Sequence, residues 1–210
     1  MVIRILVFAG NKREARDKAQ EILDELCESR HFDYGTFFDE ESPVSGKVRW
    51  GGYPTVAEVK TPSVETLMAY RMKEDYLDPT DPKLNENEKA WALILEGVKW
   101  TIKKQKRNLQ KLRIALSEYK DEDFWFRPTK KEYEVNNKYH ENLDIGMIKF
   151  YCYSLGQCKG PNVYLYDNDG EGITDENHLR NVLKKWEDIT TEYVNLRLFV
   201  VPVDVHFLEG

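Results

Sequence analysis

Gly10, Asn11, Lys12 and Arg13 form a stretch whose chemistry can be named from residue types alone. The nearly unbroken apolar run Val2–Ala9 precedes it and an amphipathic pattern follows it, so the turn should join a buried strand to a helix. Ligands of open α/β sheets gather at the carboxyl ends of strands, and helix amides there favour anions. Lys12 and Arg13 would add two cationic donors. We expect these four residues to bind a nucleotide or other phosphorylated small molecule; the alternative is a plain turn with exposed basic residues.

The segment from Val7 to about Glu14 resembles the opening of the inosine-triphosphate pyrophosphatase family, where a strand runs into a Thr/Gly-Asn turn and a basic helix. The chain has no counterpart of that family's acidic Asp-Asp-Ser-Gly-Leu segment. Neither the G-x-G-x-x-G pattern nor the P-loop pattern is present. No family is assigned from this stretch.

A second candidate site is acidic. Asp167, Asp169, Glu171 and Asp175 are closely spaced after a predicted strand, and such carboxylates suit a hard cation such as Mg²⁺ or Ca²⁺. We therefore expect a metal site there, and the alternative is a solvent-facing acidic turn that caps the following helix.

The same acidic segment resembles two known loops, each with a departure. Its beginning resembles an EF-hand loop, Asp-x-Asp-x-Glu-Gly, but His178 stands at position twelve, where that loop has a bidentate Glu. It also resembles motif one of the haloacid-dehalogenase-like phosphatases, an apolar strand followed by Asp-x-Asp-Gly. Glu171 replaces the threonine of that motif.

The elements that must position these residues indicate an α/β fold. We predict a mainly parallel or mixed sheet of about four to six strands with a helical insertion that contains one long helix. Residues 1–210 should form a single α/β domain, with 63–120 as a helical insertion or layer within it. The expected strands are 2–9, 48–50, 56–59, 145–154, 162–166 and 193–207, and the expected helices are 12–27, 64–76, 85–120 and 174–187. Residues 29–46 are predicted as a surface connection, and 129–142 as either a helix or a loop.

The long helix, Asn85 to Lys120, has the strongest pattern in the sequence. Asn85 and Glu88 make a capping box, and an apolar stripe follows at alternating steps of four and three. From Trp91 to Ile102 the residues beside the stripe are apolar as well, so this half should be buried on more than one side. The stripe consists of Trp91, Leu95, Val98, Ile102, Gln105, Leu109, Leu112, Leu116 and Tyr119. We expect Leu109, Leu112 and Leu116 to be largely buried.

The second half of this helix is basic, because Lys103 to Arg113 contains six cations and no acidic residue lies between Glu96 and Glu118. An ordinary solvated face explains this pattern. The functional alternatives are a phosphate or nucleic-acid surface and a coiled-coil seam for a second copy of the chain. The sequence thus leaves two classes open: a protein that binds, hydrolyses or senses a phosphorylated small molecule, and a non-catalytic interaction protein that uses the long helix. Whether it is an enzyme stays open.

Composition limits the binding partners and the cellular location that the sequence predicts. The net charge of −6 argues against bulk attraction to nucleic acid or anionic membrane, although a local basic face can still act. No apolar run approaches the length of a membrane span, and Val2–Ala9 is too short for a signal peptide. Cys27, Cys152 and Cys158 suggest neither a disulfide framework nor a zinc site, so we expect reduced thiols and a cytoplasmic protein. The alternative is a disulfide between Cys152 and Cys158 across a turn.

Overall fold

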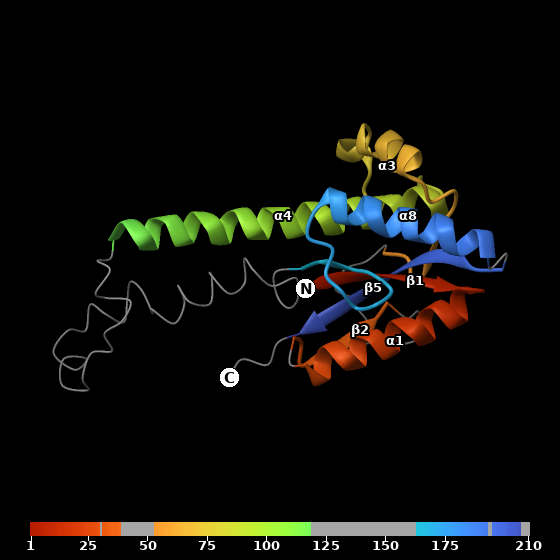
Figure 1. Cartoon of the computed structure of the whole chain (residues 1–210), viewed down its shortest axis with the longest axis horizontal. Helices are drawn as coiled ribbons and strands as arrows, with labels where there is room; N and C mark the ends of the chain where they lie inside the picture. Colours follow the sequence, from red (N-terminus) through yellow and green to blue (C-terminus); the bar gives the residue numbers. More distant parts are fainter. Residues whose placement is uncertain (30, 39–52, 119–162, 193–194, 207–210) are drawn as a thin grey trace. The chain divides into compact units, whose positions relative to one another are not determined.

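The computed structural model describes residues 1–29, 31–38, 53–118, 163–192 and 195–206 and contains a five-stranded mixed sheet (Figure 1). Its strands are β1 (Val2–Ala9), β2 (Tyr34–Phe37), β3 (Ala57–Val59), β4 (Leu165–Tyr166) and β5 (Arg197–His206). The order is β2-β5-β1-β4, and β3 also pairs with β5. The predicted α/β class with a mixed sheet is confirmed. The sheet is not mainly parallel, however: β1 and β4 are parallel, whereas β5 is antiparallel to β1, β2 and β3.

The chain divides into two compact units, Met1–Ile102 with Lys159–Gly210, and Lys103–Cys158. The boundary falls inside the long helix, and the sheet belongs to the first unit. The insertion at 63–120 stays a prediction. The expected strands at 48–50 and 145–154, the segment 129–142, Cys152 and Cys158 lie outside the described residues.

One face of the sheet is covered by α1 (Lys12–Glu28), as Figure 1 shows below β1 and β5. Every residue of β1 is buried, as its nearly unbroken apolar run predicts, and the burial includes Arg4. Its odd-numbered residues share one hydrophobic cluster with the apolar side of α1. That side consists of Ala15, Ala19, Ile22, Leu23 and Leu26, the residues that the helical spacing selects.

The other face is covered by the first half of α4 (Glu86–Glu118) together with α8 (Glu176–Glu192) and α3 (Val64–Arg71), which the short 3₁₀ helix η1 (Glu74–Tyr76) follows. Gly97 explains how closely α4 approaches β4. A Cβ atom at this position would lie 3.0 Å from Leu165 Cβ and 3.2 Å from the carbonyl oxygen of Tyr164. Glycine therefore permits the packing, although it weakens helix propensity. Among the described residues, no helix is long and apolar enough to cross a membrane.

The predicted start of α4 is confirmed. Asn85 Oδ1 accepts the amide of Glu88 at 3.0 Å, and Glu88 Oε2 accepts the amide of Asn85 at 2.9 Å, which is the reciprocal pattern of a capping box. Ala90 through Leu95 are all buried. Since Trp91, Leu95 and Val98 contact the sheet's own cluster, this half of the stripe is not a free seam for a second copy.

The second half of α4 departs from the prediction. Leu109 is 37% exposed, Leu112 is half-buried, and the side chain of Leu116 lies outside the described residues. Asn108 is buried instead. Leu109 lies about 100° around the helix from Asn108. The more buried side of this half therefore includes Leu112 of the predicted stripe together with Asn108, which the stripe did not include, and it leaves Leu109 exposed.

Two further predictions about the sheet are wrong. Tyr34–Phe37 lies in the predicted surface connection but forms β2. The alternation of Val203, Val205 and Phe207 with Asp204 and His206 predicts a half-exposed end for the last strand, and Pro202 predicts a break, an edge or a bulge in it. Instead β5 is continuous and buried from Leu198 to Val205. The amide of Arg4, opposite Pro202, bonds to Tyr164, so the missing N–H of Pro202 faces the other edge. On that edge, Pro202 lies between Val200, the last residue paired with β3, and Val203, the first residue paired with β2. No hydrogen bond of the sheet is therefore lost.

Candidate functional site

The turn before α1 uses its polar groups internally. Asn11 caps the helix by accepting the amide of Glu14 at 3.0 Å, and Glu14 Oε2 accepts the amide of Gly10 at 2.8 Å. The hydrogen bond from Gly10 and the one from Lys18 lower the pKa of Glu14. A carboxylate of the chain therefore occupies the anion position that the sequence suggested for a phosphate. Arg13 is exposed to solvent.

The acidic loop, residues 167–175, is also held by internal bonds. Asp167 Oδ1 accepts the amides of Asp169 at 3.0 Å and Glu171 at 2.9 Å. Asp169 pairs with Lys185 at 2.6 Å. Asp175 caps α8 by accepting the amide of His178 at 2.9 Å. These contacts are the ones that the capping-turn alternative predicts.

The structure does not bring the four predicted metal ligands together. Within the described ranges, no group of three or more His, Cys, Asp or Glu side chains is arranged to hold a metal ion. Binding of Mg²⁺ or Ca²⁺ by Asp167, Asp169, Glu171 and Asp175 stays a prediction. The loop does meet the end of β1, because Asn168 Oδ1 accepts the amide of Phe8 at 2.9 Å.

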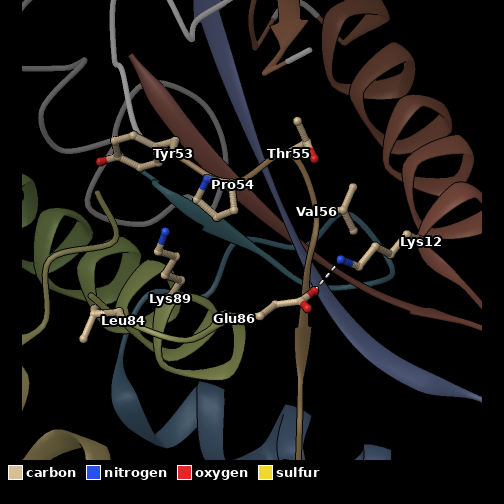
Figure 2. A pocket seen from close by; sticks show the side chains of 8 residues that line it. All are labelled: Lys12, Tyr53, Pro54, Thr55, Val56, Leu84, Glu86 and Lys89. Atoms are coloured by element: carbon tan, nitrogen blue, oxygen red, sulfur yellow. Dashed lines mark ion pairs between the residues drawn. The ribbon is translucent and has the colours of Figure 1, made fainter. Parts of the chain in front are cut away.

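A cavity of about 310 Å³ opens beside Lys12, which is the one residue of the predicted phosphate site that lines it. This volume lies at the lower end of small-molecule sites, roughly 300–1,000 Å³. We call it the lysine pocket. Figure 2 shows Lys12 reaching toward Glu86 from one side and Lys89 extending toward Pro54 and Tyr53 from the other. The lining residues are Lys12, Tyr53, Pro54, Thr55, Val56, Leu84, Glu86 and Lys89.

The charges of the lysine pocket come from the first turns of two helices. Lys12 Nζ lies 2.5 Å from Glu86 Oε1, while no ion pair in the described part of the chain involves Lys89. With all three groups ionised the lining carries one net positive charge. Partial burial opposes ionisation of Glu86, but the hydrogen bonds from Lys12 and from the Glu58 amide outweigh it and lower the pKa of Glu86.

Glu86 also protects the outer edge of β3. The amide of Glu58 donates to Glu86 at 3.4 Å, and the amide of Lys60 donates to Asn87 Oδ1 at 2.8 Å. Side chains from the start of α4 thus occupy donors that an exposed edge would otherwise offer to another strand. The same contacts fix the position of Glu86 and, through it, of Lys12.

Tyr53 forms an anchored wall of the lysine pocket. Its hydroxyl donates to Glu96 Oε2 at 2.8 Å and accepts from Arg4 Nη2 at 3.3 Å. Arg4 is buried in β1 and pairs directly with Glu96. Burial raises the pKa of Tyr53, and the charge of Arg4 offsets only part of this rise. The ring also contacts Phe38, with centroids 5.4 Å apart, so Tyr53 is held before any ligand arrives.

The layers and the mixed sheet make this an α/β protein. The chain belongs to the family whose model is described as Domain of unknown function (DUF7995), which matches residues 1–76 and 77–207. Neither a curated protein nor a solved structure matches the chain.

Sequence reasoning missed Glu86 and Lys89 as site residues because it treated the start of α4 as a capping signal only. Lys12 was selected from its place after β1, and that argument concerned the strand's end rather than a neighbouring helix. The available signal was the run Glu86-Asn87-Glu88-Lys89 at a second helix start. Linking that run to Lys12 requires the tertiary structure.

Proposed function

We propose that the protein binds a phosphorylated small molecule in the lysine pocket. The observation that carries this proposal is the convergence of Lys12 and Lys89, from two helices, on one cavity whose lining carries a single carboxylate. Lysine ammonium groups are effective point charges for phosphate. The proposal covers binding and assigns no catalytic step.

The lining suits a ligand with more than a phosphate group. Tyr53, Pro54, Val56 and Leu84 form its less polar part, and ligand sites commonly combine such walls with a few polar groups. Glu86 can accept a hydrogen bond from a ligand hydroxyl beside the phosphate. A nucleotide or a sugar phosphate has this combination of groups. We include a cytosolic setting in the proposal, since Cys27 is a free thiol.

Lys89 should contribute most of the new binding energy. Lys12 is already neutralised by Glu86, whereas Lys89 is half-buried and not engaged in an ion pair with any described residue. A charge-assisted hydrogen bond is worth roughly 1.5–3 kcal/mol. Loss of the Lys89 charge should therefore weaken binding about tenfold or more.

Thermal-shift measurements with inorganic phosphate, sugar phosphates and nucleotides test the proposal. A ligand at about one hundred times its Kd stabilises by about 2.7 kcal/mol, which corresponds to roughly 5–10 °C in Tm for a chain of this size. Lys89→Gln should remove most of the shift. Lys184→Gln is the matched control, because Lys184 is an exposed lysine of α8 that does not line the pocket.

The proposal fails if none of these ligands shifts the Tm of the wild-type protein. It also fails if a ligand shifts the Tm of Lys89→Gln as much as it shifts the Tm of the wild type and of the control Lys184→Gln. The ligand would then bind outside the lysine pocket.

A further inference from the structure

The second half of α4 carries a separate charged surface. We call its six cations the basic face: Lys103, Lys104, Lys106, Arg107, Lys111 and Arg113. Lys104 is half-buried and the other five are exposed. They extend over about 15 Å of helix at 1.5 Å per residue. The segment 103–113 itself contains no carboxylate.

These cations occupy one side of the helix. At 3.6 residues per turn they fall within roughly half of its circumference, and the opposite side holds Asn108 and Leu112. Asn108 is buried and Leu112 is half-buried. The helix therefore has an inner side that is already covered and an outer side that is basic. In the described part of the chain, no ion pair engages Lys106, Arg107 or Arg113.

The like charges disfavour one another. Partial burial lowers the pKa of Lys104, and the neighbouring Arg107 and Lys111 lower it further. Cations four residues apart on a helix repel by a few tenths of a kcal/mol per pair. A polyanion that lies along this side would reduce the repulsion between the cations, so its binding would be electrostatically favourable.

We propose that the basic face binds the phosphate backbone of nucleic acid without reading its sequence. A row of cations matches the regular row of charges along a nucleic-acid strand. A membrane surface is the poorer match. A helix that lies in a membrane interface needs a continuous apolar side to insert, whereas the two exposed apolar residues here, Leu109 and Ile114, lie on different sides of the helix.

The net charge of −6 limits the strength of this binding but does not abolish it. At about 0.1 M salt the Debye length is about 10 Å, so charges beyond that distance are largely screened. Sequence-independent binding of this kind typically has a Kd of about 10⁻⁴ to 10⁻⁶ M at physiological salt and strengthens steeply as salt is lowered.

Fluorescence anisotropy with a labelled oligonucleotide of about 20 nucleotides tests the proposal, with salt varied from about 50 to about 200 mM. The variant Lys106→Gln/Arg107→Gln/Arg113→Gln should weaken binding at least tenfold and reduce the salt slope by about 2–3. The control Lys73→Gln/Lys83→Gln/Lys184→Gln removes three exposed lysines from elsewhere, all outside the basic face. It should bind as the wild type does.

Several results would overturn the proposal. Absence of binding at low salt is one, and equal losses in the two triple variants, which would indicate general charge attraction, is another. Tighter binding to anionic vesicles than to the oligonucleotide, with the same dependence on the three cations, would identify a membrane surface instead. Lys89→Gln should leave oligonucleotide binding unchanged, which separates this proposal from the lysine pocket.

Discussion

The acidic loop and the lysine pocket are both rich in charge, yet their charged groups are used differently. In the loop, Asp167 accepts two backbone amides, Asp169 pairs with Lys185, and Asp175 caps α8. In the lysine pocket, Lys12 and Lys89 face a cavity, and one of them has no described ion-pair partner. Charge density alone would rank the loop first.

The difference teaches that a polar group becomes a candidate for ligand binding only when the fold leaves its bonding capacity unused. A buried or partly buried polar group is costly unless it is satisfied, so short acidic loops commonly satisfy their own backbone. Asp167 and Asp175 do so here, and Asp169 pairs with Lys185. The lysine pocket has capacity left over, and this contrast can be tested by removing charges from each region.

The largest effect should come from Glu96, which supports the Tyr53 wall of the lysine pocket. Arg4 is about 1% exposed and pairs with Glu96. Glu96→Ala would leave a buried cation without its partner, which costs roughly 3–5 kcal/mol. Urea unfolding should show this loss, and Tyr53→Phe should cost less because the ion pair remains. Equal stabilities of Glu96→Ala and wild type would show that Arg4 reaches water.

A smaller effect is expected in the acidic loop. The Asp167 side chain is 14% exposed and Asp169 is 55% exposed. Asp167→Ala removes an ionised acceptor of two amides and should cost roughly 2–3 kcal/mol in the free energy of unfolding. Asp169→Ala removes a surface ion pair and should cost less than about 1 kcal/mol. Urea unfolding of both variants measures the contrast.

Addition of Mg²⁺ or Ca²⁺ tests the predicted metal site of the acidic loop against the capping-turn alternative. If its carboxylates serve only the backbone, the Tm should be equal in EDTA and in millimolar Mg²⁺ or Ca²⁺. A metal-dependent rise that Asp169→Asn abolishes would instead support the predicted metal site, and the loop would no longer contrast with the lysine pocket.

The smallest expected effect comes from a substitution at Glu86, and it concerns the affinity of the lysine pocket for an anion. Glu86→Gln raises the net charge of the lysine pocket lining, so binding of inorganic sulfate should strengthen a few-fold by calorimetry. Stability should change little, because the Lys12–Glu86 pair is largely exposed. Weaker binding of a hydroxyl-bearing ligand to this variant, with stronger binding of sulfate, would show that Glu86 contacts a ligand hydroxyl.

The pH dependence follows from the same group. The pKa of Glu86 lies below its usual value of 4.5. The ion pair of Glu86 with Lys12 therefore stabilises the fold at pH values above the usual pKa, and this contribution is lost as pH falls through the lowered pKa. Glu86 should stay ionised between about pH 5.5 and about pH 8, so sulfate affinity should be flat there. A rise in affinity as pH falls within this window would contradict the lowered pKa.

Much of the fold was predictable because its signals are local. The buried run of β1, the apolar side of α1 and the Asn85–Glu88 capping box all depend on residues within a few positions. The place of β2, the burial of the end of β5 and the exposure of Leu109 depend on distant partners, and there the predictions failed. For the candidate site, the sequence suggested Lys12, whereas the approach of Lys12 to Glu86 and Lys89 depends on tertiary structure.

Isothermal titration calorimetry of the phosphorylated ligand with the largest thermal shift tests the central claim most directly. Wild type and Lys184→Gln should bind it with equal Kd, Lys89→Gln should bind about tenfold or more weakly, and Lys12→Gln/Lys89→Gln should bind least. Circular dichroism should show all four proteins folded. If the double variant binds with the same Kd as wild type, the lysine pocket is not the binding site.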